Sequence, residues 1–202
     1  MKQIKSHDFK EVYEWLGIDL NKLGCLMLDT EGLKLPSHII QDWETGSGVN
    51  FDTFFKELFM YKANNKDRFW INGYVGDKPH LTLLYGLMTE AKNYKNHIEK
   101  VLSGWDMKTV KIADIGYFDS PYQDEKYYCV VAHIEVTPEL MEGHQRMEFL
   151  PHINTFAGYK PHITIAYLKK DDVARDIFIE DLKKSFIGKE LKVIELNYGG
   201  NK

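Results

Sequence analysis

Two copies of one short sequence contain the side chains best suited to chemistry. Residues 78–87 read KPHLTLLYGL and residues 160–169 read KPHITIAYLK, so the copies lie 82 residues apart. Each copy contains a histidine and a threonine two positions apart, and together we call them the His/Thr quartet: His80, Thr82, His162 and Thr164. In a strand, this spacing puts the quartet on one face and the intervening apolar residues on the other. One His-x-Thr is common, but two copies with the same Lys-Pro before and tyrosine after indicate a shared site.

Two imidazoles and two hydroxyls suit the cleavage of a phosphodiester. A neutral imidazole can take a proton from the attacking oxygen while a protonated one donates to the leaving oxygen. The ordinary histidine pKa of about 6.5 lets both forms exist near neutral pH. Threonine hydroxyls can donate hydrogen bonds to the non-bridging oxygens, where negative charge builds up. Histidine also binds metals, but threonine is a poor ligand and no carboxylate or cysteine recurs at the same offset. We therefore expect no metal and no other cofactor.

Further side chains are candidates for binding a substrate. Aromatic residues in or beside expected loops could stack on a nucleobase, and they are Trp70, Tyr117, Phe118, Tyr122 and Tyr159. Lys160 adds positive charge before the second proline, and Glu195 is a candidate for a base edge or a ribose hydroxyl. An ordinary core or surface role is the alternative for each of them. Tyr85 and Tyr167, three positions after each threonine, are expected in the core.

The elements that must position these residues follow from the hydrophobic pattern. Strands are predicted at 24–29, 80–87, 110–118, 127–136, 162–168 and 191–198. Helices are predicted at 8–17, 51–59, 89–103, 138–148 and 171–186, with Thr137 as an N-cap before Pro138. This order of elements predicts an α+β fold on a largely antiparallel sheet.

Composition limits the function classes. The chain has 202 residues, 44% hydrophobic and 13% aromatic, enough for a substantial core in one domain, residues 1–202. It has 26 basic and 30 acidic residues, which argues against a strongly basic nucleic-acid coat. Two cysteines, Cys25 and Cys129, are too few for a disulfide framework and indicate a reducing compartment. With no signal-peptide or transmembrane pattern, we expect a cytoplasmic protein.

The paired motifs resemble the 2H phosphoesterase superfamily, which has one His-x-Thr in each half of an α+β domain. The wider phrases KPHLTLLYGL and LPHINTFAGYKPHITIAYLKKD are most similar to the phage anti-CBASS nucleases, the Acb1 family. The resemblance covers roughly residues 24–198 and is specific over 78–87 and 150–172. It implies two pseudo-symmetric lobes, with outer helices, around a concave and largely antiparallel sheet. Residues 36–79 would then be an inserted loop and helix region near the cleft.

The resemblance also implies a function, with the His/Thr quartet as the catalytic residues. The protein would be a metal-independent phosphodiesterase that hydrolyses cyclic di- or trinucleotides, the messengers of bacterial CBASS immunity. If phage-encoded, it would act in the host cytoplasm. Its partner would be a cyclic oligonucleotide, with no long nucleic acid and no membrane. Two alternatives stay open: a LigT-type RNA 2′,3′-cyclic or 2′-5′ phosphodiesterase, and a non-catalytic sponge that sequesters the nucleotide.

Overall fold

The computed structural model describes most of the second half of the chain and part of the first. The described residues are 13, 15–19, 22–31, 33, 79–119, 127–154, 158–169 and 172–199, and of 127, 166–169 and 172–174 the backbone alone. The predicted helix at 51–59, most of that at 8–17, and the inserted region up to residue 78 lie outside them. Trp70 and Tyr122, two of the substrate-binding candidates, also lie outside the described residues.

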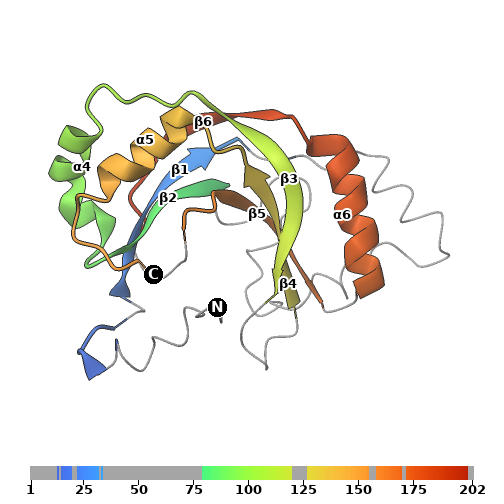
Figure 1. Ribbon diagram of the computed structural model, residues 1–202, viewed down its shortest axis with the longest axis horizontal. Helices are drawn as coiled ribbons and strands as arrows, with labels where there is room; N and C mark the ends of the chain where they lie inside the picture. The colour runs from blue at the N-terminus through green and yellow to red at the C-terminus, as the bar shows by residue number, and fades with distance from the viewer. Residues whose placement is uncertain are drawn as a thin grey trace.

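The described residues form one six-stranded antiparallel sheet. Its strands are β1 (Gly24–Thr30), β2 (His80–Leu87), β3 (Thr109–Asp119), β4 (Tyr127–Ile134), β5 (His162–Lys169) and β6 (Glu190–Asn197). They follow the order β1-β2-β5-β4-β3-β6, and every neighbouring pair is antiparallel. The predicted α+β class and antiparallel sheet are confirmed (Figure 1).

The sheet is closed as well as curved, which the sequence did not indicate. The first residues of β6 pair with β3, where Val110 lies opposite Leu191. Its later residues pair with β1, where Leu28 lies opposite Leu196. One strand thus joins both ends of the strand order and makes a closed barrel.

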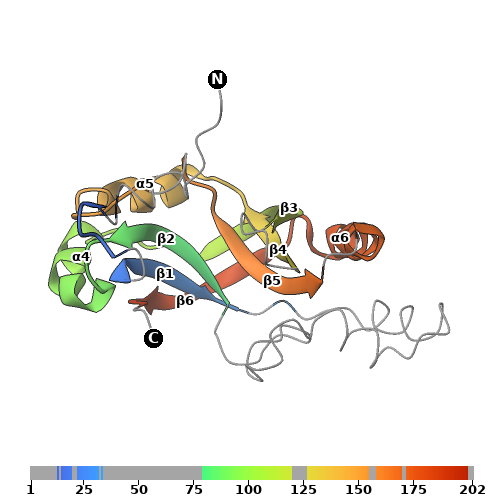
Figure 2. The ribbon, with the colours of Figure 1, turned by 90° about the horizontal axis from the view of Figure 1, so that it is seen from below.

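Helices cover the two ends of the barrel separately. They are a 3₁₀ turn η4 (Ala91–Tyr94), α4 (Lys95–Val101), α5 (Pro138–Met147) and α6 (Asp172–Phe186). Figures 1 and 2 show α4 and α5 beside β1 and β2, and α6 beside β3 at the other end. The predicted helix over 89–103 is therefore divided between η4 and α4. No helix in the described part of the chain is long and apolar enough to cross a membrane.

The start of α5 follows its predicted capping. Thr137 accepts a hydrogen bond from the backbone N–H of Leu140 at 3.2 Å, and Pro138 occupies the first turn. Proline suits this position because the first helical N–H groups have no partner inside the helix.

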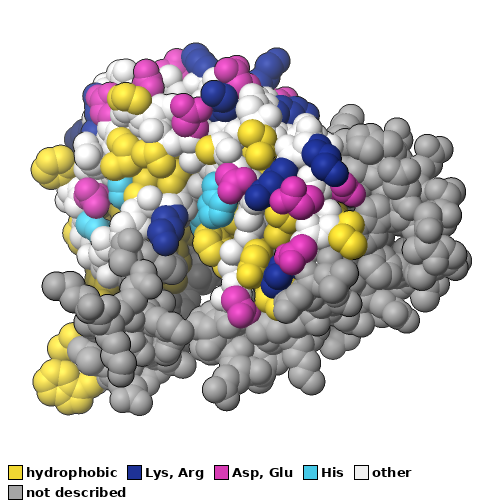
Figure 3. All heavy atoms as spheres, turned by 45° about the vertical axis from the view of Figure 1, so that its right-hand side comes forward, with side chains coloured by type: hydrophobic (Ala, Val, Ile, Leu, Met, Phe, Trp, Pro, Cys, Tyr) yellow, Lys and Arg dark blue, Asp and Glu magenta, His cyan; other side chains and the backbone are white. Residues whose placement is uncertain are grey.

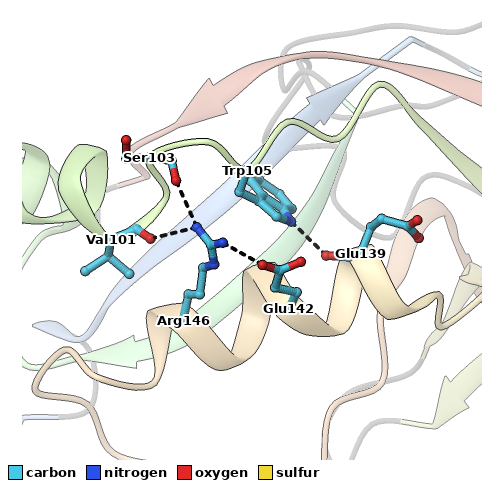
Figure 4. A network of polar contacts seen from close by, with 6 residues as sticks. All are labelled: Val101, Ser103, Trp105, Glu139, Glu142 and Arg146. Carbon is cyan, nitrogen blue, oxygen red and sulfur yellow. Dashed lines mark hydrogen bonds and ion pairs between the residues drawn. The ribbon is translucent and has the colours of Figure 1, made fainter.

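Polar contacts fix α5 against the loop between α4 and β3 (Figure 4). The indole N–H of Trp105 donates to the carbonyl of Glu139 at 2.7 Å. The guanidinium of Arg146 donates to the carbonyls of Val101 and Ser103 at 3.2 and 3.0 Å. Because both ends of the helix are held, its inner face has a defined position over β2.

Candidate active site

Strand pairing brings the two His-x-Thr motifs together. β2 and β5 are antiparallel neighbours, and Leu81 lies opposite Ile163. Both are buried in the core, whereas the quartet is half-buried, so the predicted division of faces is confirmed. Extending this antiparallel register by one residue in each direction puts each histidine across from the threonine of the other motif. The quartet is thus arranged with local twofold symmetry about the Leu81–Ile163 pair.

The residues before each histidine repeat this symmetry. The carbonyl of Pro79 accepts a hydrogen bond from Thr30 at the end of β1, at 2.8 Å. The carbonyl of Pro161 accepts one from Ile134 at the end of β4, at 2.9 Å. A proline has no N–H to satisfy and is tolerated where a strand begins. The Lys-Pro-His sequence therefore precedes or begins β2 and β5 in the same way.

The residue after each threonine forms a β-bulge, which the sequence did not reveal. Consecutive residues of β1 pair with Thr82 and Leu84, which leaves Leu83 as an extra residue. Consecutive residues of β4 likewise leave Ile165 as an extra residue on β5. Bulges bend a strand and redirect its side chains, and they are frequent beside active sites.

The first bulge corrects the expected position of Tyr85. We expected this ring in the core from strict alternation along the strand. Because Leu83 is an extra residue, the alternation shifts by one, and Leu84 is buried instead. Tyr85 is 38% exposed and lies opposite Cys25, on the same face as the quartet.

The His162 ring is oriented by a backbone carbonyl just before β5 and by a neighbouring aromatic ring. Its Nδ1 lies 2.8 Å from the carbonyl of Lys160, which can only accept, so Nδ1 carries the proton. Phe118 packs against the imidazole with ring centroids 4.9 Å apart and planes at 79°. Burial lowers the pKa of His162 below its ordinary value; the hydrogen bond to the Lys160 carbonyl opposes this shift, and His133 and His80 add to it. A neutral ring protonated at Nδ1 presents the lone pair of Nε2, as a general base requires.

His133 is a third histidine on this face, and the sequence analysis missed it. It lies directly across from His162 on β4. A Cβ at Gly116 would lie 2.8 Å from the His133 Nε2, so a larger residue there would displace this ring. Burial lowers the pKa of His133, while the nearby Asp114 opposes that shift. A histidine alternating with apolar residues inside a strand was the available signal.

A buried carboxylate lies beside the other histidine. Asp29 is 1% exposed and lies directly across from His80 on β1. Its Oδ1 accepts a hydrogen bond from the side chain of Asn197 at 2.8 Å. Glu195, a predicted binding residue, lies across from Asp29 on the same face. The lone acid near the end of the apolar run Gly24–Thr30 could have revealed this position.

The remaining candidates are divided between the two faces. Phe118 is on the site face, in contact with His162. Tyr117 is on the opposite face of β3, where Tyr128 and the guanidinium of Arg175 pack against it. Lys160 is exposed; its carbonyl contacts His162, and its positive charge contributes to the lowered pKa of His133.

Tyr159 is on the helix side of the sheet. Its hydroxyl donates to the carbonyl of Thr82 at 3.0 Å. Its ring stacks on His144 of α5, with centroids 3.9 Å apart and planes at 6°. The structure therefore brings Tyr159 to the backbone of the first motif, not to the quartet's face. Among the described residues, no group of three or more His, Cys, Asp or Glu side chains could hold a metal ion.

The chain belongs to the 2′-5′ RNA ligase superfamily, whose sequence pattern it matches over residues 62–198. This is the 2H phosphoesterase superfamily, whose members are phosphodiesterases. The superfamily-level resemblance is thereby confirmed.

Two solved structures of one protein are similar to the chain. Kluyveromyces marxianus Usb1 matches with a TM-score of 0.46 and 11% identity, over 89% of this chain and 95% of Usb1. Usb1 with uridine monophosphate matches over the same shares, with a TM-score of 0.46 and 10% identity. No curated protein matches the sequence.

Proposed function

We propose that the protein is a metal-independent phosphodiesterase that opens cyclic di- or trinucleotides in the cytoplasm and so counters CBASS immunity. The observation that carries phosphodiester cleavage is the pairing of Leu81 with Ile163, around which the quartet is symmetric. One phosphate on this axis could contact both histidines and both threonines. The choice of substrate is supported by the resemblance of both motif phrases to the phage anti-CBASS nucleases.

The surroundings of the two histidines support a division of roles. The lowered pKa of His162 keeps the ring neutral near pH 7, which suits a general base. His80 is then the general acid, with the Asp29 carboxylate across from it as an acceptor that can orient the ring. His162 Nε2 takes the proton of the ribose 2′-hydroxyl while the 2′-oxygen forms a bond to phosphorus. The bond from phosphorus to the 5′-oxygen breaks, and His80 supplies that oxygen with a proton.

The threonines stabilise charge in this reaction. Their hydroxyls donate to the non-bridging oxygens, which gain negative charge in the transition state. The Thr164 hydroxyl also contacts the Cys129 Sγ at 3.8 Å. The immediate product has a 5′-hydroxyl and a 2′,3′-cyclic phosphate.

A long nucleic acid is the less suitable partner. Nucleic-acid binding relies on a basic stripe along the backbone. The chain has a net charge of −4, and Figure 3 shows acidic and basic side chains intermixed over one face of the described residues. We therefore place the LigT-type RNA phosphodiesterase second and the sponge third.

A substrate panel in EDTA separates these functions. The panel contains a cyclic dinucleotide, a cyclic trinucleotide, RNA with a 2′,3′-cyclic end and a 2′-5′-linked oligonucleotide, each followed by chromatography. We expect cleavage of the cyclic oligonucleotides. Cleavage of the RNA substrates alone would favour the RNA enzyme, and binding without cleavage would favour the sponge.

The 2′-hydroxyl mechanism has its own test. A cyclic dinucleotide that lacks the 2′-hydroxyl should bind but resist cleavage, because the internal nucleophile is missing. Rapid cleavage of this analogue would indicate attack by water.

A further inference from the structure

The bulge after Thr82 is held by two side chains from the helix side of the sheet. The carbonyl of the extra residue, Leu83, lies 2.7 Å from the Nδ1 of His144. Because a carbonyl only accepts, His144 is the donor. The neighbouring carbonyl of Thr82 accepts a hydrogen bond from the Tyr159 hydroxyl at 3.0 Å. Two consecutive carbonyls at the bulge thus have side-chain partners.

These two side chains form one rigid unit. Their rings stack with centroids 3.9 Å apart and planes at 6°, so neither can rotate without displacing the other. Burial raises the pKa of the Tyr159 phenol, which keeps its hydroxyl protonated as a donor.

The unit is anchored at both of its ends. His144 belongs to α5, which Trp105 and Arg146 tie to the loop before β3 (Figure 4). Tyr159 lies three residues before His162, in the segment that enters β5. The backbone at Thr82 is therefore connected both to a fixed helix and to the second motif.

We propose that His144 and Tyr159 are positioning residues that hold the β2 bulge and aim the Thr82 hydroxyl at the phosphate. The inference rests on the proposed function of Thr82. It also assigns Tyr159, a candidate for base stacking from its sequence context, to a role in which it does not contact substrate. Placement errors of about 1 Å can reduce a rate on the order of a hundredfold, so a support of this kind affects turnover.

Tyr159→Phe tests the hydroxyl alone, because it keeps the ring and its stack. We expect kcat to fall roughly fivefold to tenfold. Tyr198→Phe is the matched control: this tyrosine also packs against the core but contacts Lys95 of α4. The control should keep wild-type activity. Equal losses in both variants would overturn the proposal.

A double-mutant cycle shows whether Tyr159 acts through Thr82. In a Thr82→Ala background, Tyr159→Phe should cause no further loss, because the hydroxyl that it aims is gone. In a Thr164→Ala background, it should cause its full loss. An equal loss in both backgrounds would show a general structural effect and refute the inference.

His144 provides a second, independent variant. His144→Gln retains a side-chain N–H donor, whereas His144→Ala removes both the donor and the stack. Glutamine should therefore restore part of the activity that alanine loses, at equal thermal stability by circular dichroism. If both variants are as active as the wild type, His144 has no positioning role.

A binding measurement separates this inference from the proposed function. The affinity for inorganic phosphate can be followed by NMR titration. It should be lower in Tyr159→Phe than in the wild type. The double variant Tyr159→Phe/Thr82→Ala should have the same affinity as Thr82→Ala alone. This coupling without turnover of any substrate would refute the phosphodiesterase and retain the positioning role. Turnover of a substrate without this coupling, in either kcat or phosphate affinity, would refute the positioning role and retain the phosphodiesterase.

Discussion

The two His-x-Thr motifs are alike in sequence and backbone but have different neighbours. Each is preceded by a proline whose carbonyl accepts a hydrogen bond from the backbone of the adjacent strand, and each has a bulge after the threonine. Around His80, the neighbouring strand carries a buried carboxylate, Asp29. Around His162, the neighbours are the aromatic ring of Phe118 and a third histidine, His133.

This difference teaches that a symmetric motif can acquire asymmetric chemistry from the strands beside it. General acid–base catalysis needs one protonated and one neutral group at the same pH. An apolar, histidine-rich environment disfavours the charged form of His162, as its lowered pKa indicates. In the proposed mechanism, the acid and base roles, which the repeated motif leaves equal, are therefore assigned to the two histidines by residues of β1, β3 and β4.

The largest effect is expected from removing either histidine. His80→Ala and His162→Ala should each lower kcat/KM roughly 10²–10⁴-fold, the usual scale for general acid–base catalysis. The double variant should lose less than the product of the two, because groups acting as a unit are not additive. The pH–rate profiles sharpen the comparison: His162→Ala should remove the acid limb of the profile, which His80→Ala should retain. Loss of the acid limb in His80→Ala instead would reverse the proposed roles.

The threonines should follow, with smaller and similar effects. Thr82→Ala and Thr164→Ala should each cost on the order of 10²-fold in kcat, as for the loss of one oxyanion donor. Thr→Ser at either position retains the hydroxyl and should recover most of the rate. A loss confined to one threonine would mean that the motifs contribute unequally to phosphate binding.

Asp29 should affect only the first motif. Asp29→Asn keeps the size of the side chain but removes its charge, and kcat should fall on the order of tenfold with KM little changed. In a His80→Ala background the substitution should have no further effect, whereas in His162→Ala it should keep its full effect. Glu99→Gln, at an exposed position of α4, is the control for charge alone. Equal effects in both backgrounds would argue against an orienting role for Asp29.

Much of this arrangement could be predicted from the sequence, because it depends on local patterns. The alternation of His80 and Thr82 with Leu81 and Leu83 predicts a strand and its buried face, and both are confirmed. The Thr137 cap likewise predicts where α5 begins. Each signal lies within a few neighbouring residues.

What the sequence did not indicate depends on contacts between distant strands. The bulge at Leu83 arises from the register of β1 against β2, so strict alternation gave the wrong face for Tyr85. His133 and Asp29 join the quartet through pairings with β5 and β2. Tyr159 faces α5 because His144 lies there, 15 residues away in the sequence.

His133 should adjust the pH dependence of the second motif. A positive charge on His133 lowers the pKa of His162, so His133→Gln should raise it. The acid limb of kcat/KM should then move to higher pH, by less than about one unit. The matched control is His97→Gln on the exposed side of α4, which should leave the limb in place. A limb that stays fixed, or moves to lower pH, would contradict the coupling between these histidines.

The smallest expected effect is on stability against pH. Burial lowers the pKa of both His133 and His162 from the ordinary 6.5. When the pH falls below about 6.5, the unfolded chain takes up protons that the folded protein does not. The free energy of unfolding should therefore decrease as the pH falls below about 6.5, until the histidines of the folded protein are protonated as well. Above that pH, these two histidines should make no contribution that changes with pH. Urea unfolding at several pH values measures this decrease, which His162→Gln should reduce and His97→Gln should not. If His162→Gln leaves the slope unchanged, burial does not keep His162 neutral, and the environments of the two motifs differ less than their neighbours indicate.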